Sequence, residues 1–131
     1  MAGVSESDIM LMGRSLGGAV VIQLAAQDPP RGQIIESTFS SFSDVARHHY
    51  PRLAWLVNPR KLNSAAQLPK YSGPLLQSHG SADNTIAFAL GHKLFAAANE
   101  PKQFVTIPRG RHNSRQSSQY YQVFNKFSDS L

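Results

Sequence analysis

The chain alternates short apolar runs with longer stretches of helical composition, and this alternation constrains the fold more than any other feature. The first run, Ile9-Met10-Leu11-Met12, is continuously apolar and ends at a glycine, as is typical of a strand buried on both faces. We expect strands over residues 9–12, 33–36, 74–78 and 103–107, and helices over residues 16–27, 44–50, 64–68, 87–99 and 116–127. Such alternation indicates βα units, so the sequence predicts the α/β class. We expect one domain over residues 1–131, with a short, mostly parallel sheet of about four strands flanked by helices.

The composition excludes several classes of protein. The 131 residues hold no cysteine, so disulfides, thiolate chemistry and cysteine-bound zinc are excluded. No apolar stretch approaches the roughly 20 residues of a membrane span. Residues 1–8 lack the basic start and apolar run of a secretory signal. We therefore expect a soluble, cytoplasmic protein with no membrane partner, no metal and no cofactor.

The net charge of +5 is a weak signal for an acidic or nucleic-acid partner. The basic residues are scattered, and the densest group holds only Arg109, Arg111 and Arg115. A solubilising surface charge is therefore favoured over nucleic-acid binding, which stays as a lesser alternative.

One serine stands between glycines in Gly13-Arg14-Ser15-Leu16-Gly17, where the first predicted strand gives way to the first predicted helix. Loops at the carboxyl ends of parallel strands carry the chemistry of such sheets, because helix N-termini point outward there. A serine on so sharp a turn has a strained backbone, and the glycines leave room for strand and helix to approach closely. The alternative is an ordinary glycine turn.

A serine hydroxyl needs a base to become a nucleophile, and the base needs an acid to orient it. Of the five histidines, His112 lies in a loop that directly follows a predicted strand, and Asp83 lies in the loop after the third strand. Ser15, Asp83 and His112 thus follow three separate strand ends, in the order serine, acid, histidine. The alternatives are a helix-capping turn residue for Asp83 and an exposed loop histidine for His112.

The other histidines and acids have lesser roles in this hypothesis. His79 ends the third strand, and we expect it to help fix the acid loop rather than to act as a second base. Glu36 and Asp44 are the reserve candidates for the acid. The remaining histidines are placed on predicted helices and form no second ligand set that would support a metal site: His48, His49 and His92.

Four stretches, LMGRSLGGA, ESTFSSFSDVA, PLLQSHGSADNTI and PRGRHN, span nearly the whole chain and resemble the C-terminal half of a lidless α/β-hydrolase. The chain is most similar to the intracellular serine esterases and peptidase-like hydrolases that resemble the Bem46 family. The resemblance implies that Ser15 is the nucleophile, Asp83 the acid and His112 the base. It also implies that the four strands are the family's last four, and that the N–H of Leu16 is one donor of the oxyanion hole.

Members of that family normally have a further half, with four more strands and a loop that supplies a second oxyanion amide. This chain begins immediately before the nucleophile strand, so the second donor has no counterpart in it. Losing one donor lowers the rate by about 10²–10³. The implied activity is carboxylic-ester hydrolysis through an acyl-serine intermediate. The alternative is a non-catalytic half-domain that serves as an assembly or scaffold element.

The substrate is less well defined by the sequence. The stretch between Ser37 and Gly73 is too short for a large lid, so we expect an open site that suits small, short-acyl esters. Arg14, Phe39 and Phe42 are the candidate substrate-binding residues. Two further aromatic residues are candidates for the pocket, although core packing explains aromatic residues more often: Tyr50 and Trp55.

The strand over residues 9–12 is expected to leave an open sheet edge, with unpaired amides and an apolar flank. The helix over residues 16–27 is apolar nearly all round, since Gln23 and Gln27 are its only clearly polar side chains. Soluble monomers seldom expose so large an apolar patch. We therefore expect self-association, as a dimer or a tetramer, through this edge or the adjoining helix faces.

Overall fold

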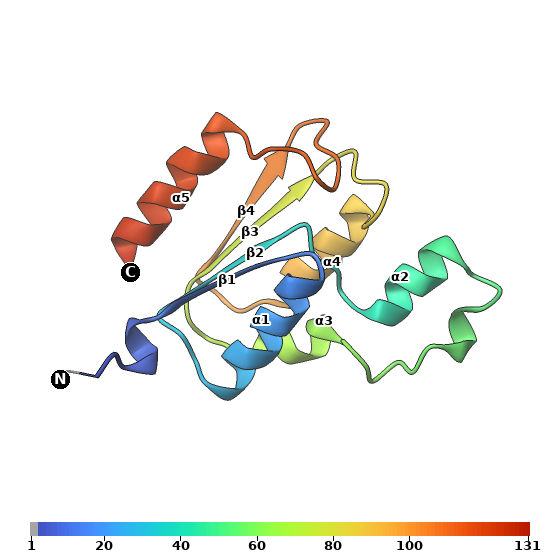
Figure 1. Ribbon diagram of the computed structural model, residues 1–131, viewed down its shortest axis with the longest axis horizontal. Helices are drawn as coiled ribbons and strands as arrows, with labels where there is room; N and C mark the ends of the chain where they lie inside the picture. Colours follow the sequence, from blue (N-terminus) through green and yellow to red (C-terminus); the bar gives the residue numbers. More distant parts are fainter. Residues whose placement is uncertain (1–2) are drawn as a thin grey trace.

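The computed structural model describes residues 3–131 as a central sheet between two layers of helices (Figure 1). The strands are β1 (Met10–Arg14), β2 (Gly32–Glu36), β3 (Leu75–Gly80) and β4 (Lys102–Ile107). The α-helices are α1 (Leu16–Gln27), α2 (Phe42–His49), α3 (Ser64–Gln67), α4 (Phe88–Ala97) and α5 (Ser118–Ser130). The 3-10 helices are η1 (Glu6–Asp8), η2 (Ala54–Leu56) and η3 (Leu68–Lys70). The expected four-stranded sheet with flanking helices is confirmed.

The four strands are parallel and follow the chain in the order β1-β2-β3-β4. In the register of the sheet, Arg14 pairs with Glu36, Glu36 pairs with Ser78, and Ser78 pairs with Val105. Because parallel strands end at the same edge of a sheet, the loops that follow the strands meet along one rim. This rim is where the sequence predicts the site.

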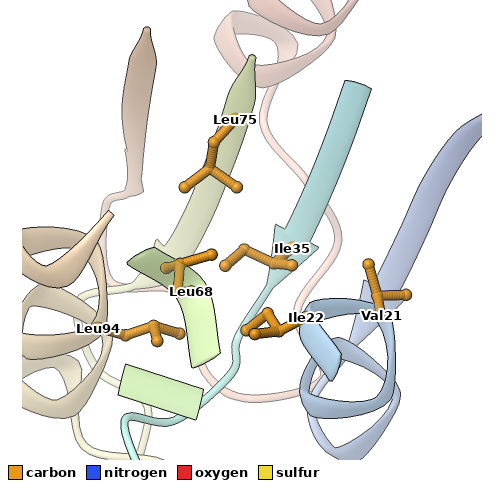
Figure 2. Close-up of a cluster of buried hydrophobic side chains, with 6 residues drawn as sticks. All are labelled: Val21, Ile22, Ile35, Leu68, Leu75 and Leu94. Atoms are coloured by element: carbon orange, nitrogen blue, oxygen red, sulfur yellow. The ribbon is translucent and has the colours of Figure 1, made fainter. Parts of the chain in front are cut away.

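An apolar core lies on each face of the sheet. Ile34 and Ile35 are adjacent on β2, point to opposite faces and are both fully buried. The core on the Ile35 face joins the sheet to α1, η3 and α4 (Figure 2), through Val21, Ile22, Leu68, Leu75 and Leu94. The core on the Ile34 face joins the sheet to α5, through Leu76, Val105, Ile107, Tyr120 and Phe127. The sheet is thus held from both sides, which fixes the positions of its strand ends.

Helices α2 and α5 each begin two residues away from the predicted start, and a serine cap explains each. Helix α2 begins at Phe42 instead of residue 44, because the Ser41 hydroxyl forms the cap and accepts a bond from the N–H of Asp44. Helix α5 begins at Ser118 instead of residue 116, because Ser117 caps it in the same way. These two corrections leave the topology unchanged.

Strand β1 lies at an edge of the sheet and, among the described residues, pairs with β2 alone. Its Met10 and Met12 side chains are exposed, as are Leu16, Val20 and Leu24 at every fourth position of α1. We call these five residues the apolar flank. The exposed apolar edge that the sequence predicts is therefore present. No helix in residues 3–131 has the length and apolar character needed to cross a bilayer.

Candidate active site

Ser15 occupies the sharp turn between β1 and α1, and its backbone is strained, with φ of 53° and ψ of −121°. A non-glycine residue in such a conformation costs about 1–3 kcal/mol and persists only where its surroundings fix it. The N–H of Ser15 donates to the Glu36 carbonyl at 2.8 Å, and the Thr38 hydroxyl donates to the Ser15 carbonyl. The N–H of Gly18 donates to the same carbonyl at 3.0 Å. The bonds to Glu36 and Thr38 hold the turn from the neighbouring strand β2 and the loop after it, and the bond from Gly18 holds it from α1.

Close packing around the turn depends on Gly13 and Gly18. A Cβ at Gly13 would lie 2.3 Å from the carbonyl oxygen of Gly17, and a Cβ at Gly18 would lie 2.4 Å from the Thr38 hydroxyl. A Cβ at Gly17 meets no atom within 4 Å among the described residues outside its chain neighbours and the nearby backbone of α1. The sequence assigned the close approach to Gly13 and Gly17, so the prediction is right for Gly13 and wrong for Gly17.

The structure brings Ser15, His112 and Asp83 into one chain of hydrogen bonds at the rim. The Nε2 atom of His112 lies 2.9 Å from the Ser15 hydroxyl, and its Nδ1 atom lies 2.8 Å from Oδ2 of Asp83. With Nδ1 protonated, the imidazole donates to the carboxylate and accepts from the serine. The His112 side chain is 15% exposed and the Asp83 side chain is fully buried. A hydroxyl, a base and an orienting acid are therefore in bonding contact.

Asp83 uses its two oxygens for different purposes. Its Oδ1 atom accepts from the N–H groups of Thr85 and Ile86, at 2.9 and 2.8 Å, which fixes the turn after β3. Its Oδ2 atom accepts from His112. The turn-capping role that the sequence left as an alternative is thus combined with the contact to the histidine.

His79 lies fully buried beneath this turn. Its Nε2 atom donates to the Ile86 carbonyl at 2.8 Å and lies 3.4 Å from Oδ2 of Asp83. Burial lowers the pKa of His79, which keeps the ring neutral despite the neighbouring carboxylate. Gly91 of α4 packs against the ring, since a Cβ there would lie 2.4 Å from its Nδ1 atom. His79 therefore supports the acid loop from inside, as the sequence suggested.

Arg14 joins the serine turn to the histidine loop, a role that the sequence analysis missed. Its Nη2 atom donates to the carbonyls of His112 and Ser114, at 2.7 and 3.1 Å. Arg14 is one of the residues predicted to bind substrate, and in the structure its guanidinium contacts main-chain oxygens on both sides of Asn113. No short-range sequence pattern predicts these bonds, because Arg14 lies 98 residues before His112 and 100 residues before Ser114.

The two phenylalanines that the sequence singled out have different environments. Phe39 is only 3% exposed and packs in a core cluster with Ala19 and Ile86, so it is a core residue. Phe42 is exposed and lines a cavity of about 470 Å³ together with Arg60 and Lys61. The Phe39 ring is thus covered and the Phe42 ring is open to solvent, and substrate binding stays a prediction for both residues.

The reserve acids are engaged elsewhere. Glu36 is buried and accepts from the Tyr120 hydroxyl, on the α5 side of the sheet. Asp44 accepts from the Ser40 hydroxyl and from Lys93, at 2.5 and 2.7 Å. Burial alone would raise the pKa of Asp44, but the bonds from Lys93 and Ser40 outweigh it, and the pKa is lowered. Neither carboxylate contacts His112, which leaves Asp83 as its partner.

The remaining polar candidates are also accounted for. The His49 ring bonds to the Thr85 carbonyl at 2.7 Å, and His92 stacks on Phe104 with ring centroids 4.4 Å apart. Within residues 3–131, no group of three or more histidine, aspartate or glutamate residues is placed to hold a metal ion.

Leu16 is the first residue of α1, so its N–H has no acceptor inside the helix and lies at the positive helix end beside Ser15.

Comparison with proteins of known sequence finds relatives that are longer than this chain. An uncharacterized protein of Mycobacterium tuberculosis is 36% identical over 120 residues, which cover 86% of this chain and 42% of the relative. The α/β-hydrolase domain-containing protein WAV2 of Arabidopsis thaliana is 30% identical over 128 residues, which cover 83% of this chain and 42% of the relative. The chain thus spans less than half the length of these relatives. No protein-family model matches it.

Comparison with solved structures identifies the fold. The match with acetyl xylan esterase 1 from Thermoanaerobacterium sp. JW/SL YS485 covers 97% of this chain and 46% of the esterase chain, with a TM-score of 0.75 and 19% identity. The match with the metagenomic α/β-hydrolase enzyme MGS-MChE2 covers 95% of this chain and 63% of the MGS-MChE2 chain, with a TM-score of 0.70 and 16% identity. The chain therefore has the α/β-hydrolase fold over the part that it spans. The narrower resemblance to the Bem46 family stays a prediction.

Proposed function

We propose that the chain is a serine hydrolase that cleaves carboxylic esters through an acyl-serine intermediate. The observation that carries the proposal is the unbroken chain of hydrogen bonds from Ser15 through His112 to Asp83. The α/β-hydrolase fold supports it, since this fold presents a nucleophile on a strained turn at the carboxyl ends of its strands. An esterase domain from a Rhodothermus marinus protein, 25% identical over 79% of this chain, has the same fold with a TM-score of 0.65.

In the proposed mechanism, His112 takes the proton of the Ser15 hydroxyl as the oxygen attacks the ester carbonyl. Asp83 holds the imidazole in the required tautomer and stabilises its charged form. The tetrahedral intermediate collapses when His112 returns the proton to the leaving alcohol, which leaves Ser15 acylated. Water, deprotonated by the same histidine, then attacks the acyl carbon; the bond from that carbon to the Ser15 oxygen breaks, and His112 returns the proton to this oxygen as the acid leaves.

The negative charge of the tetrahedral oxygen needs donors aimed at it. The N–H of Leu16 and the positive end of α1 supply one donor next to Ser15. In our proposal, a second donor comes from another loop, a second copy of the chain or water. Without a second donor, the rate is expected to be lower by about 10²–10³.

Small, short-acyl esters are the substrates that we propose. The acyl group of such an ester needs little binding surface beyond the rim, and the exposed Phe42 ring is an apolar surface that the proposal assigns to it. The acetyl xylan esterase named above has the same fold, but its identity to this chain is too low to carry its substrate over.

Turnover of p-nitrophenyl acetate by the wild-type protein and by Ser15→Ala tests the proposal. We expect hydrolysis by the wild type that is lost in the variant, with unchanged circular dichroism. Serine-independent turnover, or none in either protein, would contradict the proposal and favour the alternative of a non-catalytic scaffold element. His48→Gln, an exposed residue of α2, is the matched control and is expected to keep full activity.

The proposal also includes self-association through the apolar flank. Its exposed methionine and leucine side chains border unpaired amides of β1, and pairing this edge with a second copy would cover both. Light scattering after size exclusion tests this point. We expect a dimer or tetramer for the wild type and a smaller species for Met10→Lys/Met12→Lys. A monomeric wild type at micromolar concentration would contradict this part of the proposal.

A further inference from the structure

The last turn of α2 and the chain that leads from it to α3 carry positive charge and contain no acidic residue. We call residues 47–61 the basic segment; its cations are Arg47, Arg52, Arg60 and Lys61. No aspartate or glutamate occurs between Asp44 and Asp83 in the sequence. Among these cations, Arg47 bonds to Asp44 at the base of the segment. The rest of the segment therefore has a positive field that no acid of its own neutralises.

The same segment exposes its largest apolar side chains. Trp55 is 79% exposed, and Leu53 and Leu56 are 56% and 63% exposed. Tyr50 is exposed to a similar extent. Single exposed apolar residues are common, but four within seven positions form a patch of the kind that marks an interaction site.

Backbone bonds hold these side chains in an ordered turn. The N–H of Leu53 donates to the Tyr50 carbonyl at 2.9 Å, and the N–H of Leu56 donates to the Leu53 carbonyl at 3.0 Å. Figure 1 shows α2 and the chain after it at the end of the molecule that lies away from α5 and from both termini. The basic segment is thus a preformed projection, with its apolar groups directed outward.

We propose that the basic segment docks on the surface of an anionic lipid bilayer. Tryptophan and tyrosine favour the interface between lipid and water, leucine side chains enter the acyl boundary, and arginine and lysine are attracted to anionic headgroups. All these side-chain types occur here within one exposed turn and its flanks. The docking is peripheral and needs no membrane span, so it revises the sequence-based expectation of no membrane partner.

Other occupants fit the same surface less well. A second copy of this chain would place the cations of two segments against one another, which is unfavourable without acids to separate them. Nucleic acid would use the cations and could stack on Trp55, but it would leave the aliphatic Leu53 and Leu56 without a partner. An anionic bilayer satisfies both the charges and the aliphatic groups. This inference does not depend on the proposed ester hydrolysis.

Trp55 is the single tryptophan of the chain, so its fluorescence reports directly on the segment. The experiment titrates the full chain with vesicles of phosphatidylcholine alone and of equal parts phosphatidylcholine and phosphatidylglycerol. We expect a blue shift of the emission with the anionic vesicles, quenching by brominated lipid, and reversal by added salt. No shift with anionic vesicles, or an equal shift with neutral ones, would overturn the proposal.

Variants that keep the tryptophan separate the two contributions. Arg52→Gln/Arg60→Gln should weaken partitioning by about 30-fold, from roughly fivefold for each charge near the surface. Leu53→Ser/Leu56→Ser should abolish the blue shift while circular dichroism stays unchanged. The matched control, Arg115→Gln/Lys126→Gln, removes the same charge from α5 and the loop before it, and should partition like the wild type. Equal loss of partitioning in the control would overturn the assignment to this segment.

Two further arms test the other occupants. A blue shift that rises with protein concentration in the absence of vesicles would show that a second copy covers the segment. A larger shift with single-stranded RNA or with polyglutamate than with anionic vesicles would show that a nucleic acid or an acidic protein is the partner. Either result would overturn the lipid proposal.

Discussion

The rim at Ser15 and the basic segment differ in whether their side chains already have partners within the fold. At the rim, Asp83 accepts from two backbone N–H groups and from His112, and the His112 ring is bonded through both of its nitrogens. In the basic segment, Trp55 and the neighbouring leucines are exposed to solvent. The polar groups of Asp83 and His112 are thus bonded within the described residues, and the basic segment presents its largest apolar side chains to solvent.

This difference separates two kinds of function. A site for covalent chemistry needs groups that are held in place before the substrate arrives, since misplacement by about 1 Å can lower a rate by 10²-fold. A docking surface needs groups whose burial is completed by the partner. We therefore expect substitutions at the rim to change turnover, and substitutions in the segment to change docking, with little crossover.

The largest effect is expected at the centre of the rim. Asp83→Asn preserves the shape of the side chain but removes the negative charge that orients the imidazole, so kcat is expected to fall by about 10⁴-fold. Steady-state hydrolysis of p-nitrophenyl acetate measures this. A variant that retains wild-type kcat would show that another group orients His112.

A smaller effect is expected from Arg14, whose guanidinium bonds to main-chain carbonyls of the loop that carries His112. Arg14→Ala releases the carbonyls of His112 and Ser114, so the imidazole is held less firmly and kcat is expected to fall by about 10²-fold. The value of KM should stay unchanged, and added guanidinium ion should restore part of kcat. A raised KM with unchanged kcat would instead support the substrate-binding role that the sequence suggested.

A more modest effect concerns the stability of the rim against acid. Because burial holds the pKa of His79 below its ordinary value of 6.5, the unfolded chain takes up a proton near that pH while the folded chain does not. The free energy of unfolding should therefore fall as the pH drops below about 6.5 and should be insensitive to His79 above it. Urea unfolding at pH values on both sides of 6.5 measures this slope.

The controls for this prediction are two substitutions of histidine. His79→Gln should flatten the acid slope, because the buried titrating group is removed. His48→Gln, on the exposed surface of α2, should keep the wild-type slope. An unchanged slope in His79→Gln would show that other groups cause the acid sensitivity.

The smallest effect is expected when a variant of one region is assayed for the function proposed for the other region. Leu53→Ser/Leu56→Ser changes the basic segment and leaves the bonds at Ser15 untouched, so the kcat/KM for p-nitrophenyl acetate in vesicle-free buffer should equal the wild-type value. Ser15→Ala, in turn, should partition onto anionic vesicles like the wild type. A large loss of turnover in the segment variant would show that the two regions are coupled.

The fold was predictable from the sequence because strand periodicity and helix breaks are local signals. The four strands, their parallel pairing and the meeting of their ends follow from the apolar runs and the lengths between them. The same topology brings Ser15, Asp83 and His112 together, as their order along the chain predicts. Their catalytic roles, the single-domain organisation over residues 1–131 and the cytoplasmic location stay predictions.

Features that depend on the course of loops were not predictable. Phe39 and Phe42 are three positions apart in one stretch of sequence, yet only packing against Ala19 and Ile86 decides that Phe39 is buried. The Arg14 bridge depends on where a loop about 100 residues away turns back. The basic segment was not predictable from the net charge of the whole chain, because its positive charge depends on the local absence of acids between Asp44 and Asp83.

The central claim is that the Ser15 oxygen is an activated nucleophile. Intact-protein and peptide mass spectrometry after treatment with a fluorophosphonate tests it most directly. The account predicts one covalent adduct, located on Ser15, that forms in the wild type and is strongly slowed in His112→Ala. No adduct, or an adduct on another residue that forms equally fast without His112, would contradict the account.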